Sequence, residues 1–521
     1  MKRFALFLLA LMLLCGMSSA EEKGLNMENN SRVFYEIFVG SFSDSDGDGI
    51  GDLRGIINRM DYLNDGDPAS GKSLGVEGLW LTPIFSSPTY HKYDATDYYQ
   101  IDPSFGTLED LRELIALCHE RDVKLIIDLP LNHTGRDHRW FRNFTNARLM
   151  HNPGNDYYDF YTWLAPDDVV PAGRHFTRMS NGLGLYESNF SDSMPELNFD
   201  NEKVRQAVLD VAAYWLDLGV DGFRFDAAKY IYYGEHDKNL EFWSWYMEEL
   251  KKINPHIYTV GEVWDGDGIT NRYLKAFNCF HFSTAMAEGL IAKTAARGDV
   301  NKFVQAVQKY QDSIHAENPE AMDIMFLANH DTDRAAGFLS MSNGRAQVAA
   351  NLYLLSPGSP FLYYGEEIGL RGSRGGEMTD ANRRLAMVWG DGDTVQDPKG
   401  STYTKQTPYS VKDLESMGGT ILQHYRKVIA LRRANPEIAR GTYTALSFPD
   451  TKAGGFLCSW NGSVVGVFHN TTENPLTLDL SIIPDVAFTQ LSFVGAGASL
   501  EGNLLTLEGQ TSAVLTLPPR E

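Results

Sequence analysis

The chain has 521 residues, and 46 Lys and Arg against 68 Asp and Glu give a formal net charge of −22. Such an acidic chain is repelled by nucleic acid and by anionic membrane surfaces, so neither is an expected partner, whereas a neutral substrate is compatible with it. The length is sufficient for two or three domains with a large hydrophobic core.

The N-terminus indicates a secretory signal over residues 1–20. Two basic residues precede an apolar run at 4–14, and small residues at 18–20 stand where a signal peptidase cuts. The run is too short to span a bilayer, and no later segment is apolar enough to do so. We therefore predict export to the periplasm or the medium without stable membrane insertion. The alternative is a lipoprotein anchored through Cys15, which the bulky Leu14 before it disfavours.

Strands and helices then alternate through most of the chain. Strands are predicted at 33–38, 77–81, 123–129, 220–226, 257–261, near Phe280, at 323–327 and at 361–364. Helices are predicted from about Leu53, at 108–121, between an Asp200 N-cap and a Gly219 stop, after Leu240, from Asn301 and at 421–433. Eight strands with intervening helices fit a closed (β/α)₈ TIM barrel over 31–133 and 200–436 better than a doubly wound sheet.

Two segments depart from this alternation. Residues 134–199 are rich in Asn, Asp, Gly, Pro and aromatic residues without a clear period, which predicts an inserted small domain. After Pro436, short alternating strands predict a separate antiparallel β-domain, a β-sandwich over 440–521. The cysteines beyond Cys15 indicate neither a disulfide framework nor a metal knuckle.

Ionisable residues follow several strands, at the end where such barrels carry their catalytic groups. Arg224 and Asp226 share one strand face, and a guanidinium favours the ionised carboxylate that a nucleophile requires. Glu262 follows the next strand beside apolar groups, which suit a general acid. His330 and Asp331 follow a later strand, and His133 follows an earlier one. Each alone is compatible with a structural role.

Together, these groups point to cleavage of a glycosidic bond. In a retaining enzyme one carboxylate attacks the anomeric carbon and a second, about 5–5.5 Å away, protonates the leaving oxygen. A metal centre is the competing use of carboxylates and histidines. It is disfavoured because Arg224 would place a positive charge at its centre.

Four segments in chain order carry a resemblance to glycoside hydrolase family 13, the α-amylase family. They are 128–133, 222–226, 261–264 and 329–331, with weaker matches at 75–83 and 358–367. The segment 194–198 is similar to that of members intermediate between the oligo-1,6-glucosidase and neopullulanase subfamilies. The resemblance covers nearly the whole mature chain and implies a TIM barrel with domain B at 134–199 and domain C at the C-terminus.

The resemblance also implies roles for individual residues. Asp226 matches the nucleophile, Glu262 the acid/base, and Asp331 the carboxylate that stabilises the oxocarbenium-like state. Substrate-binding roles are implied for Tyr93 (a sugar-stacking platform), Asp94 (a terminal-glucose ligand of exo-acting members), His133, Arg224, Lys229, His330 and Arg384. We hypothesise that Arg384 pairs with Asp94 and closes one end of the cleft.

An acidic loop after the first strand predicts a Ca²⁺ site. Carboxylates at alternate positions with intervening glycines can surround a hard cation. The family resemblance implies a calcium loop whose ligands are Asp44, Asp46, Asp48, Asp52 and the Ile50 carbonyl. A second calcium near Asn132 is not expected, because Tyr230 stands where such family members have a histidine.

The function implied by the resemblance is that of an α-amylase cleaving α-1,4 bonds in a neutral α-glucan, as a monomer. Ala227-Ala228-Lys229 after the nucleophile is similar to amylase-like members. An α-glucosidase or oligo-1,6-glucosidase is the alternative, favoured by Asp94 and Arg384. An inactive barrel that only binds glucan or protein is disfavoured, because all three carboxylates are present.

Overall fold

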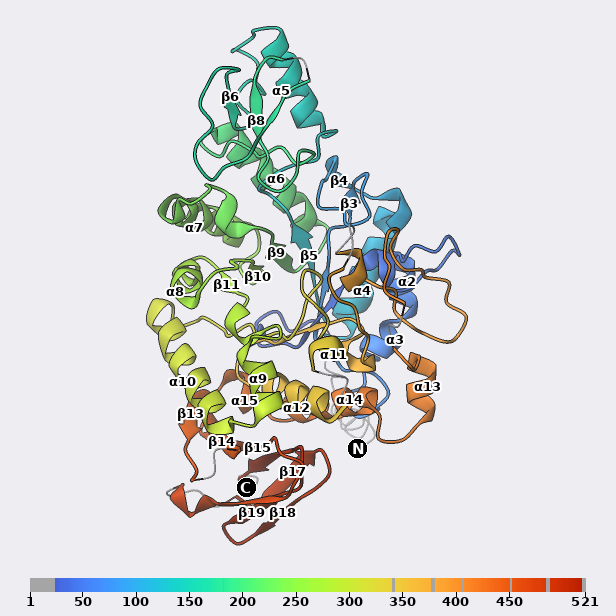
Figure 1. Cartoon of the computed structure of the whole chain (residues 1–521), viewed down its shortest axis with the longest axis vertical. Coiled ribbons are helices and arrows are strands. Elements are labelled where there is room, and N and C mark those ends of the chain that lie inside the picture. Colours follow the sequence, from blue (N-terminus) through green and yellow to red (C-terminus); the bar gives the residue numbers. More distant parts are fainter. Residues whose placement is uncertain are drawn as a thin grey trace, which may run out of the picture.

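The computed structural model describes residues 24–180, 182–339, 343–375, 380–404, 407–449, 452–483 and 488–517. The predicted signal and Cys15 lie outside these residues. Figure 1 shows three regions along the long axis: the segment after β5 at one end, the parallel strands in the middle and the C-terminal strands at the other end. Within the described ranges, no helix is long and apolar enough to cross a membrane.

Seven parallel strands form one sheet in the order β11-β10-β9-β5-β2-β1-β12. Their bounds are β1 (Phe34–Ile37), β2 (Gly78–Leu81), β5 (Lys124–Leu129), β9 (Gly222–Phe225), β10 (Tyr258–Gly261), β11 (Asn278–Cys279) and β12 (Phe361–Tyr363). The segment predicted as a strand at 323–327 is reduced to two parallel bridges, Phe280 with Ile324 and Phe326 with Phe361. These bridges join the two edge strands, so the sheet closes and the predicted (β/α)₈ barrel is confirmed.

Helices surround this barrel (Figure 1). They are α2 (Leu53–Asn58), α3 (Met60–Leu63), α4 (Leu108–Glu120), α6 (Glu202–Asp217), α7 (His236–Ile253), α8 (Asp267–Thr270), α9 (Leu290–Arg297), α10 (Val300–Glu317), α11 (Ala335–Phe338), α12 (Asn343–Leu354), α13 (Val411–Ser416), α14 (Ile421–Arg433) and α15 (Pro436–Arg440). The N-cap predicted at Asp200 is wrong by one residue, because Asn201 accepts the hydrogen bond from the Lys203 N–H at 2.9 Å. Gly219 ends α6 as predicted, with a φ of +101°.

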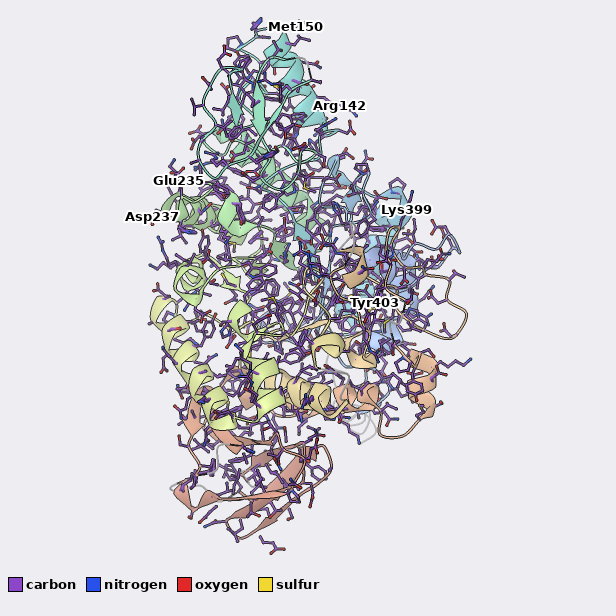
Figure 2. The ribbon with its side chains drawn as sticks, viewed as in Figure 1. Arg142, Met150, Glu235, Asp237, Lys399 and Tyr403 are labelled. Carbon is purple, nitrogen blue, oxygen red and sulfur yellow. The ribbon has the colours of Figure 1, made fainter. Side chains whose placement is uncertain are left out.

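The segment between β5 and α6 has its own small structure. It contains α5 (Arg139–Leu149) and a three-stranded antiparallel sheet of β6 (Trp163–Leu164), β8 (Leu185–Glu187) and β7 (Phe176–Arg178). Backbone hydrogen bonds from Leu197 N to Asn132 O (3.0 Å) and from Thr134 N to Pro195 O (3.1 Å) attach it to the barrel rim. Arg142 and Met150 lie toward its outer end (Figure 2). A further antiparallel pair, β3 (Phe85–Ser86) and β4 (Asp97–Ile101), follows β2.

The C-terminal residues form two antiparallel sheets, as predicted. One has the order β13-β14-β15-β20-β17 and the other β16-β19-β18. The strands are β13 (Thr442–Leu446), β14 (Ala453–Trp460), β15 (Ser463–Asn470), β16 (Leu476–Asp479), β17 (Gln490–Val494), β18 (Ala498–Glu501), β19 (Leu504–Leu507) and β20 (Thr511–Thr516). They enclose a separate apolar cluster. The described cysteines Cys118, Cys279 and Cys458 are all buried and unpaired, in agreement with the sequence.

The barrel interior changes character along its strands. Phe34, Ile126 and Val260 belong to an apolar cluster that fills it, and each is completely buried. Side chains two residues further along a strand lie on the same face. Those next inward-facing positions are Glu36 and Asp128, and Glu262 follows where β10 ends. A layer of ionisable groups therefore covers the apolar core at the C-terminal end of the barrel.

Candidate active site

The Arg224 guanidinium is the centre of this ionisable layer. One terminal nitrogen, Nη1, contacts both oxygens of Asp128 at 2.9 and 3.1 Å and also Asp226 Oδ1. The other, Nη2, lies 2.9 Å from Glu262 Oε2. Burial alone would lower the pKa of Arg224, but the surrounding carboxylates, Asp128 first among them, hold it well above its ordinary value. Arg224 is therefore a fixed cation that gathers three carboxylates.

The predicted nucleophile and acid thus contact the same guanidinium through different nitrogens. Asp226 follows β9 and is largely buried. Glu262 follows β10, and burial together with the nearby Asp226 raises its pKa to about 7, against the opposing effect of Arg224. Ala227, left-handed at a φ of +48°, directs its N–H to Glu262 Oε2 at 3.0 Å. Glu262 can therefore hold a proton near neutral pH beside the Asp226 carboxylate, which Arg224 holds in place, as a retaining mechanism requires.

Asp331, the third predicted catalytic carboxylate, lies between two cations. His330 Nε2 is 3.0 Å from its Oδ2, and Arg384 Nη2 is 2.8 Å from its Oδ1. Burial would raise the pKa of Asp331, but His330, Arg384 and Arg224 hold it far below its usual range. Asp331 therefore stays ionised and suits the stabilisation of a developing positive charge.

The hypothesised pair of Asp94 and Arg384 is wrong. Asp94 is buried and accepts hydrogen bonds from the hydroxyls of Ser87 (2.6 Å) and Thr89. Arg384 instead contacts Asp331, the hydroxyl of Tyr90 (3.1 Å) and the carbonyl of His330 (3.0 Å). The hydroxyls already satisfy Asp94, and the closer Asp331 carboxylate holds the guanidinium.

Three other predicted substrate residues lie around these carboxylates. The Tyr93 ring stacks on His330 at a centroid distance of 5.6 Å, and its hydroxyl is 2.8 Å from Asp128 Oδ2. His133 is buried with Nδ1 unpartnered, and burial lowers its pKa to about 4, so it is neutral at neutral pH. Lys229 Nζ contacts the Trp264 carbonyl at 2.6 Å and Asp265 at 2.9 Å, on the Glu262 side.

Sequence reasoning missed several residues of the site. The sequence places Asp128 in the segment 128–133 and Glu36 in the strand predicted at 33–38, but its pattern assigns a role to neither. Their signal is a carboxylate with an apolar residue on either side in a fully buried strand. Exposed aromatic side chains were also missed: Phe190 lies beside His133, and Trp264 stacks on Phe282 at 4.8 Å. Such exposed rings near the carboxylates are surfaces on which sugar rings can stack.

The acidic loop brings three of the four predicted calcium carboxylates together. One oxygen each of Asp44, Asp46 and Asp48 lies within 4.8 Å of the others. Oxygen donors this close fit a hard divalent cation. Asp52 is outside that group, and its two oxygens accept the N–H groups of Gly55 (2.6 Å) and Ser45 (2.9 Å).

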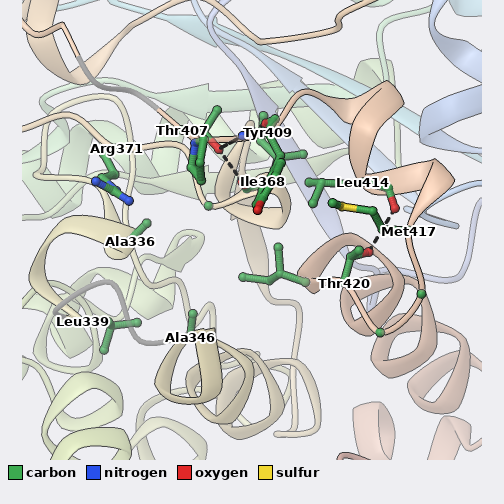
Figure 3. A pocket seen from close by; sticks show the side chains of 15 residues that line it. Ala336, Leu339, Ala346, Ile368, Arg371, Thr407, Tyr409, Leu414, Met417 and Thr420 are labelled. Carbon is green, nitrogen blue, oxygen red and sulfur yellow. Dashed lines mark hydrogen bonds between the residues drawn. The ribbon is translucent and has the colours of Figure 1, made fainter.

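A separate cavity of about 540 Å³ lies between α11, α12 and α13 (Figure 3). Its wall is mostly apolar, with the Thr407 hydroxyl bonded to the Ile368 carbonyl and the Thr420 hydroxyl to the Leu414 carbonyl. Among its described lining residues there is no carboxylate and no histidine. We therefore assign the chemistry to the carboxylates around Arg224.

Known proteins match this chain over nearly its whole length. The family model "Alpha amylase, catalytic domain" matches residues 36–441. "Alpha-amylase 3" of Dictyoglomus thermophilum is 33% identical and covers 93% of each chain. "Trehalose synthase/amylase TreS" of Mycolicibacterium smegmatis is 29% identical, and the match covers 80% of this chain and 77% of that protein. A "Probable alpha-glucosidase" of Rhizobium meliloti is also 29% identical, and the match covers 86% of this chain and 90% of that protein.

Among the similar solved structures, two share the fold over nearly the whole chain. "Eubacterium rectale Amy13B" has a TM-score of 0.87 and 31% identity, covering 96% of this chain and 98% of its own. The α-amylase from H. orenii has a TM-score of 0.81 and 36% identity, covering 94% and 99%. The names of the relatives thus include hydrolases and a trehalose synthase.

Proposed function

This chain belongs to the α-amylase family, and we propose that it is an exported, calcium-binding α-amylase acting on α-1,4 bonds of starch, glycogen and maltooligosaccharides with retention of configuration. The observation that carries this proposal is the single guanidinium shared by Asp226 and Glu262. Asp226 would attack the anomeric carbon while protonated Glu262 donates to the leaving oxygen. Glu262, then ionised, would activate the water that hydrolyses the glycosyl-enzyme.

The α-1,4 and endo character is tested by a product profile on soluble starch, maltotriose and isomaltose. We expect mixed maltooligosaccharides early in starch digestion and no cleavage of isomaltose. The absence of an Asp94–Arg384 pair supports this choice, because that pair was the feature expected to close one end of the cleft. Glucose as the only early product, or fast isomaltose cleavage, would establish the α-glucosidase or oligo-1,6-glucosidase alternative instead.

Removal of Ca²⁺ is expected to lower the thermal midpoint of the protein. A cation at 100 times its Kd that binds only the folded chain stabilises it by about 2.7 kcal/mol. Chelation followed by thermal denaturation measures this loss, and adding Ca²⁺ should restore the midpoint. Asp46→Asn/Asp48→Asn should abolish the response, because both carboxylates belong to the cluster.

The matched control for the calcium loop is Asp65→Asn/Asp67→Asn. This pair also lies in a loop in which a carboxylate accepts an N–H two residues later, but it belongs to no carboxylate cluster among the described residues. Its response to chelation should equal that of the wild type. An unchanged midpoint of the wild type in chelator would reject the proposed site. The proposed export is tested separately, by sequencing the N-terminus of the mature protein.

A further inference from the structure

The buried carboxylate of Glu36, on β1, contacts the active-site residue His330. Glu36 Oε1 lies 2.5 Å from His330 Nδ1 and 3.3 Å from the His330 backbone N. Glu36 is 1% exposed and His330 is fully buried, so water does not compete for this contact. Among the described residues, Glu36 accepts hydrogen bonds from His330 and makes none with Asp226, Glu262 or Asp331, so it acts on the site through the histidine.

The other ring nitrogen of His330 faces the site. His330 Nε2 is 2.6 Å from the Tyr93 hydroxyl and 3.0 Å from Asp331 Oδ2. The Tyr93 hydroxyl is also 2.8 Å from Asp128 Oδ2, a carboxylate that already accepts from Arg224. Burial raises the pKa of Asp128 to about 7, so above that pH Asp128 is a carboxylate that only accepts. Tyr93 then donates to Asp128 and must accept from Nε2. Both nitrogens of His330 thus face acceptors, which an imidazolium satisfies and either neutral tautomer does not.

We propose that Glu36 is a positioning residue of the active site, which holds His330 as an imidazolium and so fixes the hydrogen bond that His330 donates to Tyr93 and its ion pair with Asp331. This inference rests on the proposed glucan hydrolysis. Burial alone would lower the pKa of His330, but Asp331 and Glu36 raise it to about 10. The remaining neighbours are the Trp80 ring edge and Arg384, which donates to the His330 carbonyl. Neither can replace the Glu36 carboxylate.

Loss of the Glu36 charge should reverse the direction of the hydrogen bond between Tyr93 and His330. In Glu36→Gln, the amide oxygen can still accept from Nδ1, but it no longer favours a second proton on the ring. A neutral His330 would turn a bare Nε2 toward Asp331, and Tyr93 would donate to that nitrogen instead of to Asp128. The orientation of Asp331 and the charge beside the anomeric carbon would both change, without loss of any group that contacts substrate.

The test is the pH dependence of kcat/KM on an α-maltosyl fluoride. Fluoride leaves without requiring a proton from Glu262, so the wild type should stay active until His330 loses its proton near pH 10. In Glu36→Gln we expect activity to fall already above the ordinary histidine pKa of about 6.5, with a loss of about 10–100-fold at pH 8. A wild-type profile in Glu36→Gln would overturn the proposal.

Asp323→Asn is the matched control. His281 Nδ1 lies 2.8 Å from Asp323 Oδ1, and both side chains are buried, but this pair lies away from Asp226, Glu262 and Asp331. Its loss should lower the thermal midpoint and leave the pH profile unchanged. A shift in this variant equal to that of Glu36→Gln would mean that any buried carboxylate–histidine pair moves the profile, and would reject a special role for Glu36.

A measurement on the wild type keeps the proposal testable if Glu36→Gln does not fold. Ring nitrogens of ¹⁵N-histidine-labelled protein are followed by NMR, and the His330 signals are identified by their loss in His330→Asn. His330 should remain doubly protonated at pH 8, and a neutral ring there would overturn the proposal. This result does not depend on turnover, so a wild type inactive on the fluoride would reject the proposed function and still leave the imidazolium state of His330 tested.

Discussion

Asp226→Asn is expected to lower kcat on maltooligosaccharides by about 10⁴-fold or more, the order of loss when a hydrolase loses its nucleophile. The amide has the shape of the carboxylate and can still accept from Arg224, so the fold and the guanidinium should be retained. It cannot form the glycosyl-enzyme bond. Steady-state kinetics on maltotetraose measures the loss, and near-UV circular dichroism checks the fold.

Two further results decide whether Asp226 is the nucleophile. A 5-fluoro-α-glucosyl fluoride should accumulate as a covalent adduct on the wild-type peptide that contains Asp226, and mass spectrometry should find no adduct on Asp226→Asn. Asp265→Asn is the control, because Asp265 is a carboxylate that pairs with Lys229 and not with Arg224. An Asp226→Asn rate within tenfold of the wild type would show that another group attacks.

Glu262→Gln is expected to lower kcat on maltotetraose by about 10²–10⁴-fold, the contribution of a general acid. The loss should be far smaller in kcat/KM for α-maltosyl fluoride, because fluoride departs without a proton. The acid must be protonated for the first step, and burial raises the pKa of Glu262 to about 7. Wild-type activity on the oligosaccharide should therefore be present below about pH 7 and decline above it.

Glu366→Gln is the matched control for the acid. Glu366 is also buried with a pKa raised to about 7 by burial, but its Oε1 accepts from the hydroxyls of Tyr353 and Tyr425, away from Arg224. This variant should keep the oligosaccharide-to-fluoride rate ratio and the decline above pH 7. In Glu262→Gln that decline should vanish. Equal losses on both substrates in Glu262→Gln would contradict its role as the acid.

The sequence predicted the parts of the site that depend on local pattern. Asp226 and Glu262 follow apolar strands, and parallel strands of a barrel end on one face, so their convergence could be expected before the structure. Contacts that depend on which acceptor lies nearest in space could not be predicted from the sequence. Arg384 is distant in sequence from both Asp94 and Asp331, and only the three-dimensional arrangement shows that it pairs with Asp331.

The missed residues have a similar physical explanation. The strand at 33–38 was predicted from its apolar side chains, and Glu36 within it carried no motif of its own. Its role follows from the register of β1 beside β12 and from the bridge between Phe326 and Phe361, which together bring the segment before His330 near it. The 323–327 strand itself was predicted in place, but its pairing is confined to single bridges because its neighbours β11 and β12 are short.

The cluster of carboxylates around Arg224 also determines which ligands the site prefers. The network contains five carboxylates, Glu36, Asp128, Asp226, Glu262 and Asp331, against the three cations Arg224, His330 and Arg384. With Glu262 protonated and the other four carboxylates ionised, four negative charges face three positive ones, so one negative charge is uncompensated. A neutral sugar leaves this imbalance, whereas the positive charge that develops at the anomeric carbon removes it. The pocket is thus electrostatically complementary to a cation with the shape of glucose, and protonated amines of that shape should be better ligands than glucose.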